Sequence, residues 1–413
     1  MNNICKVSIK GLWGIKNISF ELNNDVNFFI GPNGTGKTTI INLIAYTIKA
    51  DITSLFRNPF TNITLYLSRN DDLSYIAVDK NEDSLVYNIH FPNQEDARFE
   101  FNQRELYERY RRMEIRDNFY NNHYKNLQKT LEDILQLSWI SVNRTSLLTE
   151  HNRDNPSIDK VINQLQNQLK GYFSFITNKC NDETDKFQKF VFKSLIEIGS
   201  YEADIINSML RNSGVEKKNL KDIFNLFSVL DKGLIKQVDA FYDDVQKAAE
   251  KILNIEDVDL RDFSYVVNAI RLQSIIKEWN TVSNTQNEIT SKKNTFLEIM
   301  ESMFQHKKLI VNESNELMIK TKEDKNFPLE FLSSGEKQLL IILGNALLHN
   351  STQNLIYVAD EPELSLHIEW QEKLVLSLKK LTPNAQIIFA THSPDIVGPY
   401  QNNTINFDKI IYG

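Results

Sequence analysis

The first and last parts of the chain carry strand patterns, whereas the middle carries a helical pattern. Val7 and Ile9 alternate with Ser8 and Lys10, which predicts a half-buried strand. Short alternating runs bounded by turn residues predict a small antiparallel sheet over residues 61–101. Apolar runs, typical of buried strands, occur at Val26–Ile30, Leu355–Ala359 and Gln386–Ala390. The stretch Ser138–Arg144 has the pattern of a strand that ends in a polar turn.

Apolar residues recur at helical spacing from residue 156 to about 305. Glycines at 171, 199, 214 and 233 interrupt this pattern, which favours a packed helical lobe or a short arm over one long coiled coil. The chain is therefore predicted to be an α/β protein with a mostly helical insertion. The predicted parts are an N-terminal part of a sheet-containing head (1–145), the insertion (146–310) and a C-terminal part of the head (311–413).

Composition narrows the class of protein. The chain has 413 residues and a net charge of −7, which weighs against a globally basic nucleic-acid binder but leaves a local basic groove open. Its two cysteines, Cys5 and Cys180, lie far apart, so a disulfide framework is not expected. We see no signal-peptide pattern and no apolar stretch of membrane-spanning length. These features predict a cytoplasmic protein without a membrane partner.

The stretch Gly31–Thr39 fits the phosphate-binding pattern G-x-x-x-x-G-K-[ST], between a predicted strand and a predicted helix. Its glycines let backbone N–H groups surround phosphate oxygens, and the helix N-terminus adds partial positive charge. Lys37 is expected to reach the β- and γ-phosphates of ATP, and the Thr38 hydroxyl to hold Mg²⁺. The expected nucleotide-binding residues are Asn33, Gly34, Thr35, Gly36, Lys37, Thr38 and Thr39.

A second glycine-containing stretch, Leu332–Gln338, opens an apolar helix. On its own it would indicate only a helix N-cap, but a serine and a glycine at a helix start also offer bare N–H groups to an anion. The expected nucleotide-contacting residues are Ser333, Ser334, Gly335 and Glu336.

Two acids follow the predicted strand at 355–359. Asp360 lies where a carboxylate can hold Mg²⁺ through water, and Glu361 where a carboxylate can polarise an attacking water. His392 follows the next apolar strand. A lone histidine is more often structural, but its place after the acidic pair favours a catalytic role toward the γ-phosphate or the water. The predicted catalytic residues are Glu361 and His392, and the predicted metal ligands are Thr38 and Asp360.

Five motifs in this order resemble those of the ABC-type ATPases. They correspond to the Walker A loop (Gly31–Thr39), the signature (Leu332–Gln338, with Ser334 and Glu336 replacing a glycine and a glutamine), Walker B (Val358–Pro362), the D-loop (Leu364–His367) and the switch histidine (His392). Asn143-Arg144 falls where the Q-loop is expected, without its glutamine. The resemblance implies a head with a mixed sheet carrying the P-loop plus a small antiparallel sheet. It also implies hydrolysis of ATP to ADP and phosphate with Mg²⁺, and an ATP sandwich that forms a homodimer or a higher homo-oligomer.

The long insertion resembles the SMC, RecF and OLD-like branch of that class. The runs Asp360–His367 and Thr391–Pro394 resemble the OLD-like (AAA_21) ATPases of bacterial defence. OLD nucleases carry a Toprim domain after the ATPase, and the few residues after His392 do not hold one. The resemblance therefore implies the ATPase subunit of a two-component anti-phage system of the PARIS (AriA) or Septu (PtuA) type. Such a subunit would control a separate nuclease or Toprim effector, with residues 146–310 as the sensing or partner lobe.

Other functions remain open from sequence. The main alternative is a RecF-like repair ATPase that binds DNA across its dimer. Residues 102–136 contain several arginines, but interleaved acids favour a solvated helix face over a DNA-binding one. A transport ATPase subunit is disfavoured by the insertion, and a nuclease acting alone by the lack of nuclease motifs. The arginines concerned are Arg104, Arg109, Arg111, Arg112 and Arg116.

Overall fold

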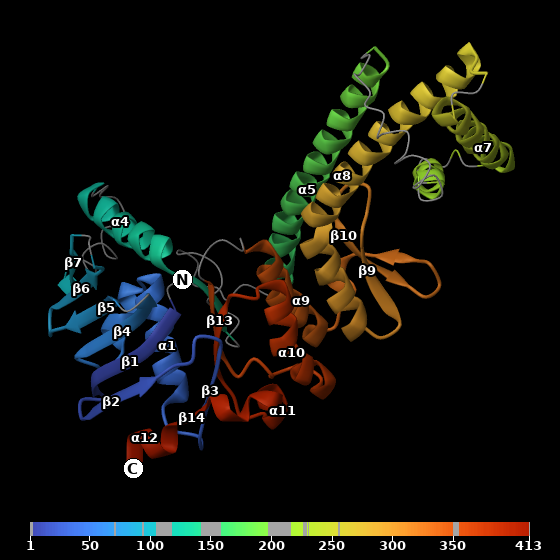
Figure 1. Cartoon of the computed structure of the whole chain (residues 1–413). Helices are drawn as coiled ribbons and strands as arrows, with labels where there is room; N and C mark the ends of the chain where they lie inside the picture. Colours follow the sequence, from blue (N-terminus) through green and yellow to red (C-terminus); the bar gives the residue numbers. More distant parts are fainter. Residues whose placement is uncertain are drawn as a thin grey trace. The chain divides into compact units, whose positions relative to one another are not determined.

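The computed structural model divides the chain into two compact units (Figure 1). Residues 1–172 and 293–413 form one unit, here called the head, and residues 173–292 form the other, here called the helical unit. The predicted insertion, 146–310, is longer at both ends than the helical unit. The residues that the structure describes are 3–69, 72–92, 95–104, 118–141, 158–196, 216–225, 229, 231–254, 257–349 and 355–412.

The P-loop strand lies inside a five-stranded sheet with the order β14-β3-β13-β12-β8. All neighbouring pairs in this sheet are parallel. β13 is buried along its whole length, and β3 and β12 are buried except at their last residues, as expected for a sheet covered on both faces. The strands are β3 (Val26–Ile30), β8 (Gln136–Ser141), β12 (Leu355–Asp360), β13 (Gln386–Ala390) and β14 (Thr404–Asn406).

The second sheet of the head is antiparallel and six-stranded, with the order β2-β1-β4-β5-β6-β7. Its strands are β1 (Asn3–Leu12), β2 (Lys16–Glu21), β4 (Asn62–Arg69), β5 (Asp72–Lys80), β6 (Ser84–His90) and β7 (Ala97–Asn102). One apolar cluster joins this sheet to α1 (Lys37–Lys49) and to strands of the parallel sheet. The predicted α/β fold class is confirmed. The sheet that carries the P-loop is wholly parallel and not mixed, because the antiparallel pairs lie in separate sheets.

The remaining elements of the head surround these sheets (Figure 1). They are α2 (Ile52–Arg57), α4 (Asn118–Ile134), η1 (Leu329–Phe331), α9 (Ser334–Leu348), α10 (Ile368–Leu381), α11 (Pro394–Val397), η2 (Gly398–Asn403) and α12 (Phe407–Tyr412). A third, three-stranded sheet contains β9 (Lys307–Val311), β10 (Leu317–Thr321) and β11 (Asn326–Phe327). This sheet directly precedes the signature-like stretch in the chain, and its β9–β10 hairpin agrees with the sequence pattern.

A buried glutamine joins the two chain segments that build the head. The Gln386 side chain is fully buried. It accepts a hydrogen bond from the Ile4 N–H at 2.9 Å and donates to the carbonyl oxygens of Ile4 and Asn23, each at 2.8 Å. Since buried amides are costly unless paired, these bonds fix β13 against the start of the chain.

Two long helices, α5 (Ile158–Ser194) and α8 (Leu260–Met303), connect the head to the helical unit, which also holds α7 (Lys232–Asn254). Within that unit the Gln286 side chain on α8 donates hydrogen bonds to the Cys180 carbonyl and the Thr184 hydroxyl on α5. None of the described helices is long and apolar enough to cross a membrane. Asn143-Arg144 and the arginines at 109, 111, 112 and 116 lie outside the described residues.

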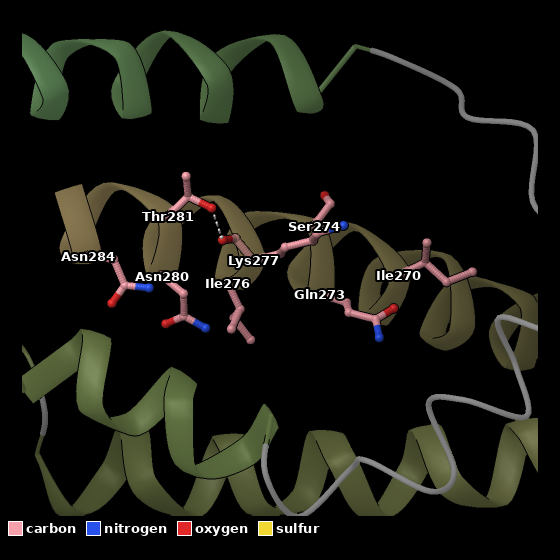
Figure 2. A pocket seen from close by; sticks show the side chains of 8 residues that line it. All are labelled: Ile270, Gln273, Ser274, Ile276, Lys277, Asn280, Thr281 and Asn284. Atoms are coloured by element: carbon pink, nitrogen blue, oxygen red, sulfur yellow. Dashed lines mark hydrogen bonds between the residues drawn. The ribbon is translucent and has the colours of Figure 1, made fainter. Parts of the chain in front are cut away.

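A polar groove of about 630 Å³ runs along α8 in the helical unit (Figure 2). Most of its lining side chains carry amide or hydroxyl groups, and Lys277 adds an ammonium. The Gln273 side chain also donates to the buried Glu216 carboxylate at 2.8 Å. The lining residues are Ile270, Gln273, Ser274, Ile276, Lys277, Asn280, Thr281 and Asn284.

Candidate nucleotide-binding site

The P-loop connects β3 to α1 and has the backbone of an anion cradle. Gly34 and Gly36 have φ values of 86° and 81°, which side-chain-bearing residues rarely adopt. A Cβ on Gly34 would meet open space, so a ligand can approach the backbone there. The Thr35 hydroxyl donates to the Pro32 carbonyl at 2.9 Å and holds the loop closed. The start of α1 therefore faces an accessible glycine turn, the arrangement that favours bound phosphate.

Lys37 lies across this loop. Its Nζ donates to the carbonyl oxygens of Gly31 and Pro32, at 2.8 and 3.1 Å, and the residue is buried. Burial lowers the pKa of Lys37, while the nearby charges of Asp360 and Glu361 act in the opposite direction. The lysine of α1 and the two acids after β12 are thus close enough to interact electrostatically.

Asp360 and Glu361 stand at the carboxyl end of β12, next to the P-loop. The Thr38 hydroxyl lies close enough to the Asp360 carboxylate to favour its ionised form. Burial raises the pKa of Asp360, the charge of Glu361 raises it further, and the Thr38 hydrogen bond and the charge of Lys37 oppose that rise. Glu361 has a left-handed backbone, with φ 48°. Such a conformation is costly for glutamate and is typical of functional sites.

Thr38 and Asp360 fit a magnesium site of the P-loop kind. Their hydroxyl and carboxylate oxygens are the hard ligands that Mg²⁺ prefers, and the two groups are close enough for Thr38 to affect the pKa of Asp360. Mg²⁺ usually takes one or two protein ligands and completes its shell with water and phosphate. In keeping with this, no group of three or more His, Cys, Asp or Glu side chains forms a metal site within the described part of the chain.

His392 follows β13, the parallel neighbour of β12, and is exposed. Its backbone N–H donates at 3.0 Å to a carboxylate oxygen of Glu363. Glu363 is not among the residues predicted from sequence, where it appeared as part of a turn. The structure shows that it connects the loop after β12 to the loop after β13.

The signature-like stretch caps α9. Ser333 is the N-cap, its side chain accepts from the Glu336 N–H at 3.4 Å, and Glu336 accepts from the Ser333 N–H at 2.8 Å. Glu336 also pairs with Lys307 at 2.7 Å. Burial acts to raise the pKa of Glu336, but the hydrogen bonds from Lys307 and Ser333 outweigh it and hold the pKa below its usual value.

Ser333 and Ser334 are exposed. Gly335 is buried and packs tightly against the loop after β12. A side chain at Gly335 would overlap the Ser365 carbonyl. Among the described residues, no hydrogen bond or ion pair joins positions 333–336 to the P-loop. Within one chain, therefore, the structure groups Lys37, Thr38, Asp360 and Glu361 but does not bring the signature-like residues to them.

Trp13 is a further residue at this site that the sequence patterns did not single out. It lies in the turn between β1 and β2, and a Cβ on Gly36 would overlap its indole ring. The Trp13 N–H donates to the Pro59 carbonyl at 2.9 Å. The Trp13 indole therefore packs directly against the P-loop at Gly36, where only a glycine fits.

Comparison with known proteins shows partial matches to defence-system ATPases. The chain is 35% identical over 81 residues to the Septu protein PtuA of Bacillus thuringiensis, which covers 16% of this chain and 20% of that protein. It is 37% identical over 73 residues to the "Retron Vc95 probable ATPase" of Vibrio cholerae serotype O1 biovar El Tor, which covers 15% of this chain and 14% of that protein. These matches span a fifth or less of either relative.

Among solved structures, the chain matches two SMC head domains. One is the Pyrococcus furiosus head with an extended coiled coil, bound to the C-terminal domain of ScpA. It has 15% identity and a TM-score of 0.43, with 96% of this chain and 91% of that chain covered. The other, from Pyrococcus yayanosii, has a coiled coil and joint. It has 14% identity and a TM-score of 0.37, with 96% and 93% covered.

A family model described as an AAA ATPase domain matches residues 3–397 of the chain. The match spans both segments of the head and the helical unit between them. ATP binding and hydrolysis are the activities that membership implies. The chain therefore belongs to the AAA ATPase domain family.

Proposed function

We propose that this protein is an ATP-gated dimer that hydrolyses ATP to control a separate effector in a bacterial anti-phage system. The observation that carries the ATPase part is the grouping of Lys37, Thr38, Asp360 and Glu361 where β12 ends beside the P-loop. It combines a cation for phosphates, oxygen ligands for Mg²⁺ and a carboxylate for an attacking water.

In this proposal each residue has a defined role. The N–H groups of residues 33–39 and the Lys37 ammonium bind the phosphates of ATP. Glu361 accepts a proton from the water that attacks the γ-phosphate, and His392 hydrogen-bonds the γ-phosphate or that water. Thr38 and Asp360 would hold Mg²⁺, which neutralises charge on the phosphates.

A second copy of the chain would complete the site. The exposed hydroxyl of Ser333 accepts from the Glu336 N–H, which leaves its own proton free to be donated to a phosphate. Because positions 333–336 make no described bond to their own P-loop, the γ-phosphate of a second protomer is their proposed partner. ATP would then hold the dimer through charge-assisted contacts that hydrolysis removes.

The defence role rests on the two partial matches, to Septu PtuA and to a retron ATPase. The effector is proposed to be a separate protein of the nuclease or Toprim class. The helical unit would be the lobe that senses the trigger or binds the effector. Its groove along α8 offers amide, hydroxyl and ammonium groups to a polar partner.

The test uses purified Glu361→Gln protein, measured by light scattering with and without ATP and Mg²⁺. We expect this variant to bind ATP, to form a lasting dimer with ATP and Mg²⁺ but not without them, and to lose hydrolysis by at least about 100-fold. An oligomeric state that does not change with ATP would overturn the gating. Glu369→Gln, which changes an exposed acid in the first turn of α10, is the matched control and should behave as wild type. Normal hydrolysis by Glu361→Gln would remove the role given to Glu361.

The same assay identifies the partner. Products of neighbouring genes and duplex DNA are added separately to the ATP-bound variant. Assembly with a neighbouring protein supports the regulatory function. Assembly with DNA alone, with a steep salt dependence, would replace it with the RecF-like repair function.

A further inference from the structure

One oxygen of Glu363 accepts three hydrogen bonds from the loop that carries His392. The Thr391 hydroxyl donates to Oε1 at 2.6 Å, the His392 N–H at 3.0 Å and the Ser393 N–H at 3.3 Å. Thr391 is almost fully buried, so this contact is shielded from water. Hydrogen bonds to an ionised carboxylate are roughly twice as strong as neutral ones. We call this arrangement the Glu363 clasp.

The other oxygen of Glu363 is buried and has no partner among the described residues. Leaving a buried carboxylate oxygen unpaired costs stability, so such a group calls for an explanation beyond packing. The negative charge of Glu363 also acts on the proposed metal ligand, since it is among the causes that raise the pKa of Asp360.

The clasp lies between the signature-like stretch and His392. The Glu363 carbonyl accepts from the Leu366 N–H at 2.9 Å and so shapes the turn that contains Ser365. The Ser365 carbonyl in turn packs against Gly335. On the other side, the Glu361 N–H donates to the Ala390 carbonyl at 2.8 Å. A contiguous path of contacts therefore runs from Gly335 through Glu363 to the backbone of His392.

We propose that Glu363 is a positioning residue for hydrolysis, which fixes the backbone of residues 391–393 and thereby aims His392 at the γ-phosphate or the water. Glu363 acts through His392 and does not contact the substrate. This inference rests on the function proposed above, in which His392 assists hydrolysis.

The test measures steady-state ATP hydrolysis by the full chain in Glu363→Ala, Glu363→Gln, His392→Ala and the Glu363→Ala/His392→Ala double variant. Misplacing a catalytic group by about 1 Å can cost about 100-fold. We expect Glu363→Ala to lower kcat about 10- to 100-fold with KM within about twofold of wild type. Glu363→Gln, which keeps an acceptor oxygen in the clasp, should recover most of that loss. Glu369→Ala, an exposed acid on α10, is the matched control.

The double variant separates a positioning role from a merely structural one. If Glu363 works through His392, removing both should cost no more than removing His392 alone, to within about twofold. Multiplied losses in the double variant would overturn the inference. Equal impairment of Glu363→Gln and Glu363→Ala would also overturn it, because the acceptor oxygen would then be irrelevant.

Two further measurements distinguish failure of the positioning role from failure of folding or of the proposed ATPase. Thr391→Val removes one donor of the clasp, and with it the hydroxyl oxygen that accepts from the Ser393 N–H at 2.9 Å, with little change of shape. It covers the case in which Glu363→Ala fails to fold. We expect it to lower kcat about tenfold with KM unchanged, and a normal kcat would overturn the inference. If His392→Ala hydrolyses ATP normally while Glu361→Gln does not, the proposed ATPase stands and the positioning role of Glu363 falls.

Discussion

The ammonium group of Lys337 lies 2.6 Å from the carboxylate of Asp159, so the helix that begins at the signature-like stretch is tied to the first turn of α5. The neighbouring residue, Glu336, pairs at 2.7 Å with Lys307, which follows α8. Consecutive residues next to Gly335 are thus anchored to the first turn of α5 and to the start of β9, the strand that follows α8. We expect a displacement of either anchor to act on the start of α9.

Asp159→Ala should destabilise the head moderately. The Lys337 side chain is only 11% exposed and would lose its carboxylate, but the Asp159 side chain is 54% exposed, so solvent screens the pair. We expect the free energy of unfolding in urea to fall by about 1 kcal/mol. Asp185→Ala, an exposed acid on the same helix, is the control. The exchange Asp159→Lys with Lys337→Asp should restore part of the loss, and no recovery would argue against the pair.

Glu336→Gln tests the second anchor and has a defined pH dependence. Hydrogen bonds from Lys307 and Ser333 outweigh burial and lower the pKa of Glu336, so its charge stabilises the fold above its unfolded pKa of about 4.3. That contribution is lost as pH falls through the lower, folded-state pKa. The variant should be less stable at pH 7 by about 2 kcal/mol, and the difference should shrink below about pH 4. Glu330→Gln, an exposed neighbour, should show neither effect.

Asp360→Asn should raise the stability of the ATP-free protein and lower its ATPase activity. Burial raises the pKa of Asp360, so its ionised form destabilises the ATP-free protein at neutral pH. The variant should melt at a higher temperature than wild type at pH 7, while hydrolysis falls at least about 100-fold. The penalty on wild type disappears as pH drops through the raised pKa toward the unfolded value, so the two melting curves should converge in acid. A variant that melts lower at pH 7 would contradict this account.

Trp13→Ala should weaken ATP binding. The indole stands against Gly36 of the P-loop. We therefore expect it to border the bound nucleotide and to stack on its base. Stacking of a base on an aromatic ring contributes about 1–3 kcal/mol, so the Kd for ATP should rise about 5- to 100-fold by calorimetry. Trp13→Phe should retain most of the affinity. If Trp13→Ala binds ATP with wild-type affinity, the indole only packs on Gly36 and does not contact the nucleotide.

Local sequence patterns predicted the elements that depend on neighbouring residues. The P-loop at Gly31–Thr39 and the acids after β12 follow from short motifs with a strand on one side and a helix or turn on the other. The helical middle of the chain was predicted from its periodicity, because the spacing of apolar residues along a helix does not depend on what the helix packs against. The strands at the start of the chain were also predicted, but alternation does not say which sheet they join.

Residues that matter through contacts across the fold were not predicted. Glu363 and Thr391 are far apart in sequence and meet only because β12 and β13 are parallel neighbours whose carboxyl ends share one edge. Trp13 reaches Gly36 through a turn whose direction no local pattern encodes. The only available signal was a polar side chain after each of two adjacent strands, which could have suggested Glu363.

The position of β3 in its sheet has a consequence for biosynthesis. Both of its neighbours, β13 and β14, come from the last part of the chain. The ribosome therefore releases the P-loop long before the strands that hold it in place, and the helical unit can fold in the interval. Asp360, Glu361 and His392 also come from this last part of the chain. We therefore expect a nascent chain to lack a finished ATP site until translation has passed His392.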